Sequence, residues 1–176
     1  GAGHLPPPLP IDLEEAILNS APLDDFLSAQ EGVKRGCERI SHFIGEIDQL
    51  HRRALVNVDP GDSVLLAKKI DASSTLAASE SASVRRLLKS MDEETKMLAS
   101  DLSPSDYRLR VSKQRALCKR FMSLMEQFES MQLLYRNKYR QQMERQFRLV
   151  KPEATEAELV ELRDSPQAMT QQVHKQ

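Results

Sequence analysis

Residues 23–55 read LDDFLSAQEGVKRGCERISHFIGEIDQLHRRAL, and their apolar positions recur three and four residues apart. The recurring positions are Phe26, Val33, Cys37, Ile40, Ile44, Ile47, His51 and Ala54. A heptad stripe of this length is typical of a long α-helix that packs side by side with other helices. We therefore expect a helix over 23–55, in which His51 is a partly buried core histidine satisfied by a neighbouring group.

Two further segments carry the same periodicity. The second covers 63–100, and its middle is filled by serines and alanines, which bury little apolar area and make it the weakest part of the expected core. Pro60 and Gly61 are turn formers that separate it from the first helix. The third covers 104–149, because Ser103 suits an N-cap and Pro104 suits the first helical position.

Each stripe is apolar on one side only, so each helix must bury that side against the others. The connections, 56–62 and 101–103, are short, as is usual between antiparallel neighbours. We predict an all-α fold in which 22–150 forms an up-down-up antiparallel left-handed three-helix bundle.

Segments outside the bundle are expected at both ends. Residues 151–176 form a linker with a short extra helix over about 155–163, because Thr155 and Glu158 have capping-box spacing. Residues 1–21 form a tail that contains the polyproline stretch Leu5–Pro10. That stretch is either a spacer or a ligand for an SH3 domain.

Composition and motifs exclude several classes of function. The formal net charge is -1, which argues against nucleic-acid binding. The chain has no glycine-rich phosphate loop, no His-Glu-x-x-His pair and no nucleophile elbow, so we expect no enzyme and no cofactor. Neither cysteine lies at helical spacing from a histidine, so we expect no metal site.

The expected environment is the cytosol. Cys37 and Cys118 lie at apolar helical positions, where reduced thiols behave as small hydrophobes, although a disulfide is the alternative. No apolar run approaches the ~20 residues that cross a bilayer. The chain begins Gly1-Ala2-Gly3-His4 without methionine, as an expressed fragment would. We expect a soluble, monomeric fragment of a longer protein.

The third segment carries more apolar width than a three-helix core needs. Val111, Cys118, Met125 and Tyr139 recur at seven-residue spacing beside its main stripe, interrupted by Gln132. Two interpretations remain open: a groove between the second and third helices that accepts a further amphipathic helix, or deeper packing of a wider helix.

The third segment is also strongly basic. Residues 108–151 hold twelve lysines and arginines against three glutamates, a difference of +9. Such a helix could meet an acidic partner or anionic lipid, or its charge could be balanced by acids elsewhere in the bundle.

Particular motifs in the third segment and after it resemble a known family. Residues 106–110 read Asp-Tyr-Arg-Leu-Arg, residues 119–122 read Lys-Arg-Phe-Met, Tyr135 is followed by Arg136, and residues 144–149 read Glu-Arg-Gln-Phe-Arg-Leu. They are similar to the third Habc helix of plasma-membrane syntaxins, which carries Asp-Leu-Arg-Ile-Arg, Arg-Lys-Phe and Arg-Gln-Leu-Glu-Ile in the same spacing. The resemblance extends over about 22–163, and residues 158–161 match the linker of the family.

The resemblance implies a regulatory domain of a SNARE protein in vesicle docking, exocytosis and membrane fusion. In this family Habc folds back on the protein's own SNARE helix, giving a closed, autoinhibited state, and binds SM proteins. The full-length protein would be tail-anchored at the cytoplasmic face of the plasma membrane and would meet other SNAREs. The Asp-Arg-Thr motif through which some syntaxins bind SM proteins is missing from 1–21.

The resemblance and the extra stripe together define candidate binding residues. The expected groove for the SNARE helix comprises Val84, Leu88, Val111, Cys118, Met125 and Tyr139. Leu159 is expected to clasp the closed state. Its neighbour Val160 replaces an acid common in the family, so contacts there should differ.

Two other classes fit the heptads. A spectrin-like helical scaffold predicts dimers or rods, whereas the syntaxin interpretation predicts a monomer. A peripheral membrane binder would use the basic third helix and would need anionic lipid.

Overall fold

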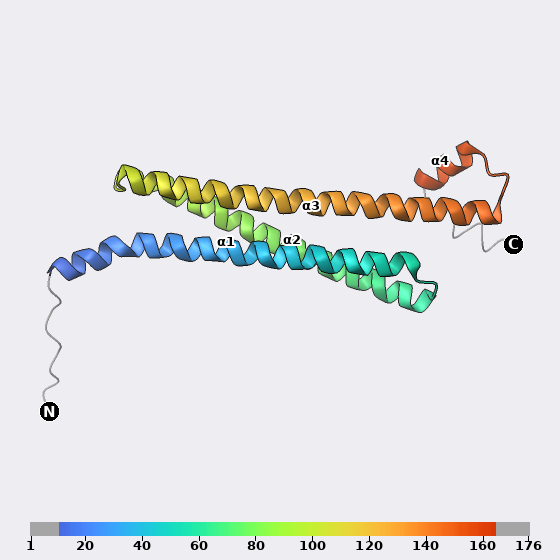
Figure 1. Cartoon of the computed structure of the whole chain (residues 1–176), viewed down its shortest axis with the longest axis horizontal. Helices are drawn as coiled ribbons and strands as arrows, with labels where there is room; N and C mark the ends of the chain where they lie inside the picture. Colours follow the sequence, from blue (N-terminus) through green and yellow to red (C-terminus); the bar gives the residue numbers. More distant parts are fainter. Residues whose placement is uncertain (1–10, 165–176) are drawn as a thin grey trace, which may run out of the picture. The chain divides into compact units, whose positions relative to one another are not determined.

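The computed structural model describes the backbone of residues 11–164 and the side chains of 23–160. Its described part holds three long helices, α1 (Ile11–Val56), α2 (Pro60–Met97) and α3 (Pro104–Val150), followed by the short α4 (Glu156–Asp164) (Figure 1). No strand occurs between residues 11 and 164. The all-α prediction is confirmed.

The starts of α1 and α2 differ from the sequence expectation. α1 begins at Ile11 instead of Leu23, since residues 14–18 contain good helix formers, whereas the polyproline stretch lies outside the described residues. α2 begins at Pro60 instead of Ser63. Asp59 is its N-cap: its Oδ1 accepts a hydrogen bond from the Gly61 amide at 2.8 Å. Proline at the first helical position needs no hydrogen-bond partner, so Pro60 begins the helix as well as ending the turn.

The expected caps of α3 and α4 are present. The amide of Asp106 donates to Ser103 Oγ at 3.2 Å, which makes Ser103 the N-cap of α3. At α4 the amide of Thr155 donates to Glu158 Oε2 at 2.9 Å and the amide of Glu158 donates to Thr155 Oγ1 at 3.4 Å. These reciprocal bonds are the predicted capping box.

The chain divides into two compact units, and α1, α2 and α3 each contribute to both. The first unit combines residues up to Glu46 with Asp71–Met125. Its core is an apolar cluster from all three helices, with Phe26, Val33, Cys37, Ile40, Val84, Leu88, Met91, Leu117, Phe121 and Leu124 buried.

Contacts in the first unit fix the helix directions. Arg110, near the start of α3, lies over the ring of Phe26 in the first half of α1 and 3.9 Å from Glu94 near the end of α2. Further along α1, Arg39 pairs with Glu80 of α2 at 2.6 Å. α2 therefore runs opposite to α1 and α3, as the up-down-up prediction requires.

Glycines allow α1 and α2 to approach closely in this unit. Gly36 is buried, and a Cβ there would collide with a methyl group of Val84. One turn earlier, a Cβ at Gly32 would lie 3.3 Å from a terminal methyl of Leu87. Val84 is fully buried because Gly36 leaves room for it.

The second unit combines Ile47–Ile70 with the chain from Glu126 onward. Ile47, Leu50, Leu66, Met131 and Tyr135 are buried there. The Tyr135 hydroxyl donates to Asp48 Oδ1 at 2.5 Å, and Gln142 Nε2 donates to the Leu55 carbonyl at 3.5 Å. α1 and α3 therefore run in the same direction in this unit too.

Candidate helix-binding surface

The structure separates the predicted groove residues by burial. Val84 and Leu88 of α2 lie in the core of the first unit, so they cannot offer the contact surface assigned to them from sequence. Cys118 and Met125 of α3 are half-buried and pack against that core, and Val111 is half-buried as well. The α3 members thus keep part of their apolar surface in solvent.

Met122 adds to this surface and was missed by the sequence analysis. It is 61% exposed, and it lies four residues after Cys118 and three before Met125, so the three share one helix face. The heptad spacing skips this position, whereas a count at i+3 and i+4 would have found it. We define the α3 apolar strip as Val111, Cys118, Met122 and Met125.

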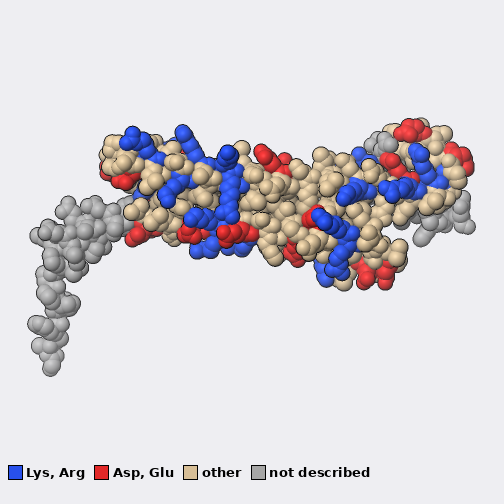
Figure 2. All heavy atoms as spheres, in the orientation of Figure 1, with Lys and Arg blue, Asp and Glu red and all other residues tan. Residues whose placement is uncertain are grey.

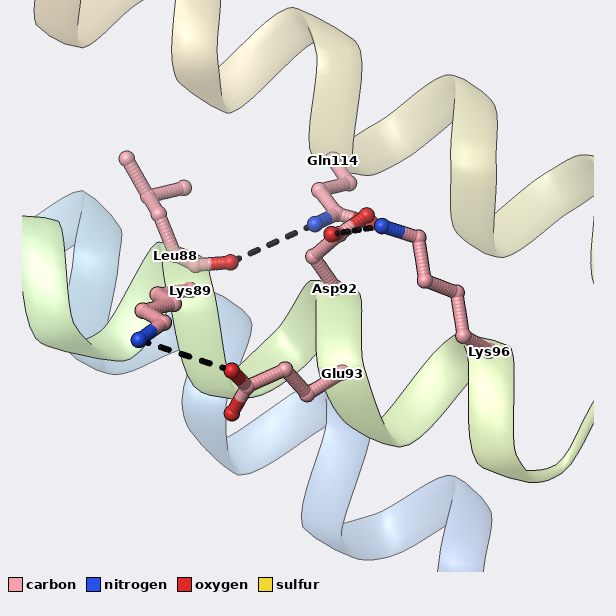
Figure 3. Close-up of polar contacts among 6 residues, drawn as sticks. All are labelled: Leu88, Lys89, Asp92, Glu93, Lys96 and Gln114. Carbon is pink, nitrogen blue, oxygen red and sulfur yellow. Dashed lines mark hydrogen bonds and ion pairs between the residues drawn. The ribbon is translucent and has the colours of Figure 1, made fainter.

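A buried polar contact ties α3 to α2 beside this strip. Gln114 is buried and its Nε2 donates to the Leu88 carbonyl at 3.3 Å (Figure 3). The Leu88 side chain itself belongs to the core. Because a buried amide needs a partner, this bond holds the two helices in one register.

Two ion pairs lie along α2 in the first unit. Lys96 Nζ pairs with Asp92 at 2.5 Å, and Lys89 lies 3.6 Å from Glu93 (Figure 3). Burial raises the pKa of the Cys118 thiol, and the charge of Asp92 raises it further, which places Asp92 on the Cys118 side of α2. Asp92 and Lys96 therefore form a polar edge next to the α3 apolar strip.

Part of the positive charge of α3 is balanced within the bundle. Arg110 is only 3% exposed, and it stacks on Phe26 at 4.8 Å and lies near Glu94. Arg120 lies 3.9 Å from Glu38 of α1. On the face shown in Figure 2, acids lie beside many of the basic side chains.

Tyr139 belongs to the second unit and has a different role from the strip. Its hydroxyl shares a hydrogen bond of 2.9 Å with His51 Nδ1, and His51 stacks on Tyr135 with ring centroids 4.4 Å apart. His51 is half-buried with a partner, which confirms the expectation for this histidine. We call His51, Tyr135, Tyr139 and Asp48 the His51 cluster.

Electrostatics in the His51 cluster follow from burial and hydrogen bonding. Burial lowers the pKa of His51, although the nearby Asp48 carboxylate opposes that effect. The hydrogen bond from Tyr135 holds the pKa of Asp48 below its ordinary value, and Arg52 acts in the same direction. Burial raises the pKa of Tyr139. These shifts favour neutral histidine and neutral tyrosines beside one carboxylate.

The two linker residues differ in burial. Leu159 is completely buried in the second unit, whereas its neighbour Val160 is 43% exposed. Lys151, just after α3, pairs with Glu158 of α4 and closes the connection between these helices. α4 is therefore anchored through Leu159.

The described residues include two cysteine thiols but no cluster of metal ligands. Cys37 and Cys118 are free thiols. Within this part of the chain no group of three or more His, Cys, Asp or Glu side chains could hold a metal ion. None of the helices described is both long and apolar enough to span a bilayer.

Comparisons with known proteins agree with this architecture. A family model described as Syntaxin matches residues 20–172. The syntaxin-like protein psy1 of Schizosaccharomyces pombe is 23% identical over 134 residues, covering 76% of this chain and 46% of psy1. The chain thus spans about half the length of that relative.

A solved structure is similar in fold. The crystal structure of the Unc18-syntaxin 1 complex from Monosiga brevicollis contains a chain that matches with a TM-score of 0.73 at 20% identity. The match covers 93% of this chain and 80% of that one. Three long packed helices followed by a short helix are therefore an arrangement already seen in a solved structure.

Proposed function

The chain belongs to the syntaxin family, and from this membership we propose that it is the regulatory N-terminal Habc domain of a plasma-membrane-type SNARE in vesicle docking and exocytosis. In the full-length protein the domain folds back on the SNARE helix and withholds it from partner SNAREs. Syntaxins are SNARE proteins and not enzymes, in agreement with the sequence analysis.

The α3 apolar strip is the observation that carries this proposal. Its members lie on one helix face and stay partly exposed, although Cys118 and Met125 also pack against the core of the first unit. Apolar side chains at i, i+4 and i+7 are suited to contact the apolar face of a further amphipathic helix. The Asp92–Lys96 pair beside them supplies a polar rim, as is usual around an apolar binding surface.

The packing of α2 against α3 also supports a binding surface that is already formed before a ligand binds. Leu88 and Val84 are held in the core, and Gln114 fixes α3 against α2. A visiting helix would meet a surface that needs little reordering, which lowers the entropic cost of binding. We propose that Leu159, by anchoring α4, holds the linker in the closed state.

An SM protein is the second proposed partner. The similar solved chain is named as part of an Unc18-syntaxin complex, and Unc18 is an SM protein. We place this chain's full-length protein at the cytoplasmic face of the plasma membrane through a C-terminal anchor. Other SNAREs would bind after the closed state opens.

The test measures binding of the SNARE segment of the full-length protein, added as a peptide, to this chain. Met122→Glu and the double variant Val111→Glu with Met125→Glu should each weaken binding about tenfold or more, equivalent to about 1.4 kcal/mol, because a charge would face the apolar helix. Ala116→Glu is the matched control, since Ala116 is exposed on α3 and lies outside the strip.

Helical circular dichroism must stay unchanged in all three variants for the comparison to count. Binding that is equal in Ala116→Glu and Met122→Glu would contradict the proposed groove.

A further inference from the structure

The turn between α1 and α2 leaves apolar side chains in solvent. Val58 is 96% exposed and Val56 is 80% exposed. Leu65, in the second turn of α2, is half exposed. Single exposed apolar residues are ordinary, but several gathered at one turn indicate a surface used for contact.

A hollow of about 250 Å³ lies beside these residues in the second unit. It is lined by Arg53, Val56, Asn57, Asp62, Leu65, Leu66 and Lys69. Leu66 is buried and forms its base, whereas Val56 and Leu65 are exposed at its sides. The lining therefore combines apolar side chains with polar ones, and the hollow is open to solvent.

The rim of the hollow is mainly basic. Arg53 of α1 and Lys69 of α2 both line it and are exposed, and neither forms an ion pair with another described side chain. Asp62 is the only acid among the described residues that line it. Two unpaired cations around an apolar base favour a ligand that combines apolar side chains with carboxylates.

We propose that this turn docks an acidic amphipathic helix from a partner protein. One apolar side chain of that helix fills the hollow against Leu65 and Leu66, and flanking Asp or Glu side chains pair with Arg53 and Lys69. The site is separate from the α3 apolar strip, so it adds a second binding surface to the domain and does not depend on the function proposed above.

A lipid surface fits the same turn less well. Asp59 and Asp62 lie at the turn beside Val58, and Asp59 is committed to capping α2. Anionic headgroups would be brought against both carboxylates, whereas a helix can place its own acids away from them.

The experiment selects ligands for the intact chain from a displayed library of random peptides long enough for about three helical turns. We expect enriched peptides with apolar residues at helical spacing flanked by Asp or Glu. Arg53→Glu combined with Lys69→Glu should weaken their binding about tenfold or more, and Leu65→Asp should do the same.

Arg85→Glu combined with Arg86→Glu is the charge-matched control, because both arginines are exposed on α2 and neither lines the hollow. It should leave affinity unchanged, and circular dichroism should show that every variant is folded. Enrichment without an acidic, apolar pattern would overturn the proposal, as would unchanged binding to the Arg53→Glu, Lys69→Glu variant. Binding to phosphatidylserine vesicles that the selected peptides do not displace would replace it with a lipid site.

Discussion

Single side chains explain the polar contacts that accompany the apolar core of the second unit. The His51 ring stacks on Tyr135, shares a hydrogen bond with Tyr139 and lies near the carboxylate of Asp48. The charged groups around it are Asp48 and Arg52 on α1 and Lys138 on α3, which lies over the Tyr135 ring. On the α2 segment of this unit Asp62, Lys68 and Lys69 are exposed. Neutral His51 thus fits a site in which burial outweighs one nearby acid.

Acidification should destabilise the second unit through His51. Its pKa in the folded chain is below the ordinary value of 6.5. As pH falls below 6.5 the unfolded chain therefore takes up a proton before the folded chain does, and stability decreases until the folded histidine is protonated as well. The pKa of Asp48 is lowered too, so its contribution is lost only in more acidic solution, as pH falls through its folded pKa.

Urea unfolding at several pH values between 5 and 7.5, together with an NMR titration of His51, measures this effect. His51→Gln should flatten the dependence in that window, and His51→Ala should cost about 1–2 kcal/mol of stability through the lost hydrogen bond and ring contact. A His51 resonance that titrates above 6.5 would contradict the assignment.

At the scale of single helices, replacing glycines of α1 by alanine tests how closely α1 packs against α2. Gly36→Ala should destabilise the chain by about 1–3 kcal/mol, because the added methyl group collides with Val84 in a filled core. Gly45→Ala should instead stabilise it by about 0.5–1 kcal/mol, since a Cβ at Gly45 meets nothing within 4 Å and alanine is the better helix former.

The two variants are chemically identical changes in one helix, so urea midpoints compare them directly. Equal effects of the two substitutions would mean that helix propensity alone decides them and that α1 does not approach α2 as closely as described.

The helices themselves were largely predictable from the sequence, whereas their starts were less so. Heptad stripes depend only on spacing, so they located all three long helices. Proline and glycine occur both in turns and in the first turn of a helix. The pair at 60–61 therefore predicts a turn, although Asp59 caps a helix that begins there. Reciprocal caps such as Thr155 with Glu158 were predictable because both partners are close in sequence.

Across the whole molecule, contacts between residues distant in sequence determine which apolar side chains are buried and which stay exposed. The sequence predicts the extra apolar stripe on α3, but only the structure shows that Leu88 and Val84 are buried in the core. Tyr139 had the right spacing for the stripe, yet it pairs with His51 because α1 presents that side chain to it. Spacing along one helix does not show which side chains of the neighbouring helix will contact it.

The isolated chain should be a monomer of about 20.0 kDa. The exposed large apolar side chains of the described residues are scattered over the helices, with Leu76 on α2 and Leu109, Leu133 and Leu149 on α3 among them. They do not form one continuous face, whereas a stable interface buries about 800 Å² per partner. A spectrin-like scaffold would instead present long apolar faces and form dimers or rods.

Light scattering over a range of concentrations and salt distinguishes these outcomes. A constant mass agrees with the syntaxin-type domain, in which we propose that the strip binds a helix of the full-length protein. A dimer that persists in the Met122→Glu variant would favour the scaffold. A dimer that is abolished by Met122→Glu but not by Ala116→Glu would show that the strip accepts a second copy, since the substitution introduces charge at the centre of the exposed apolar surface.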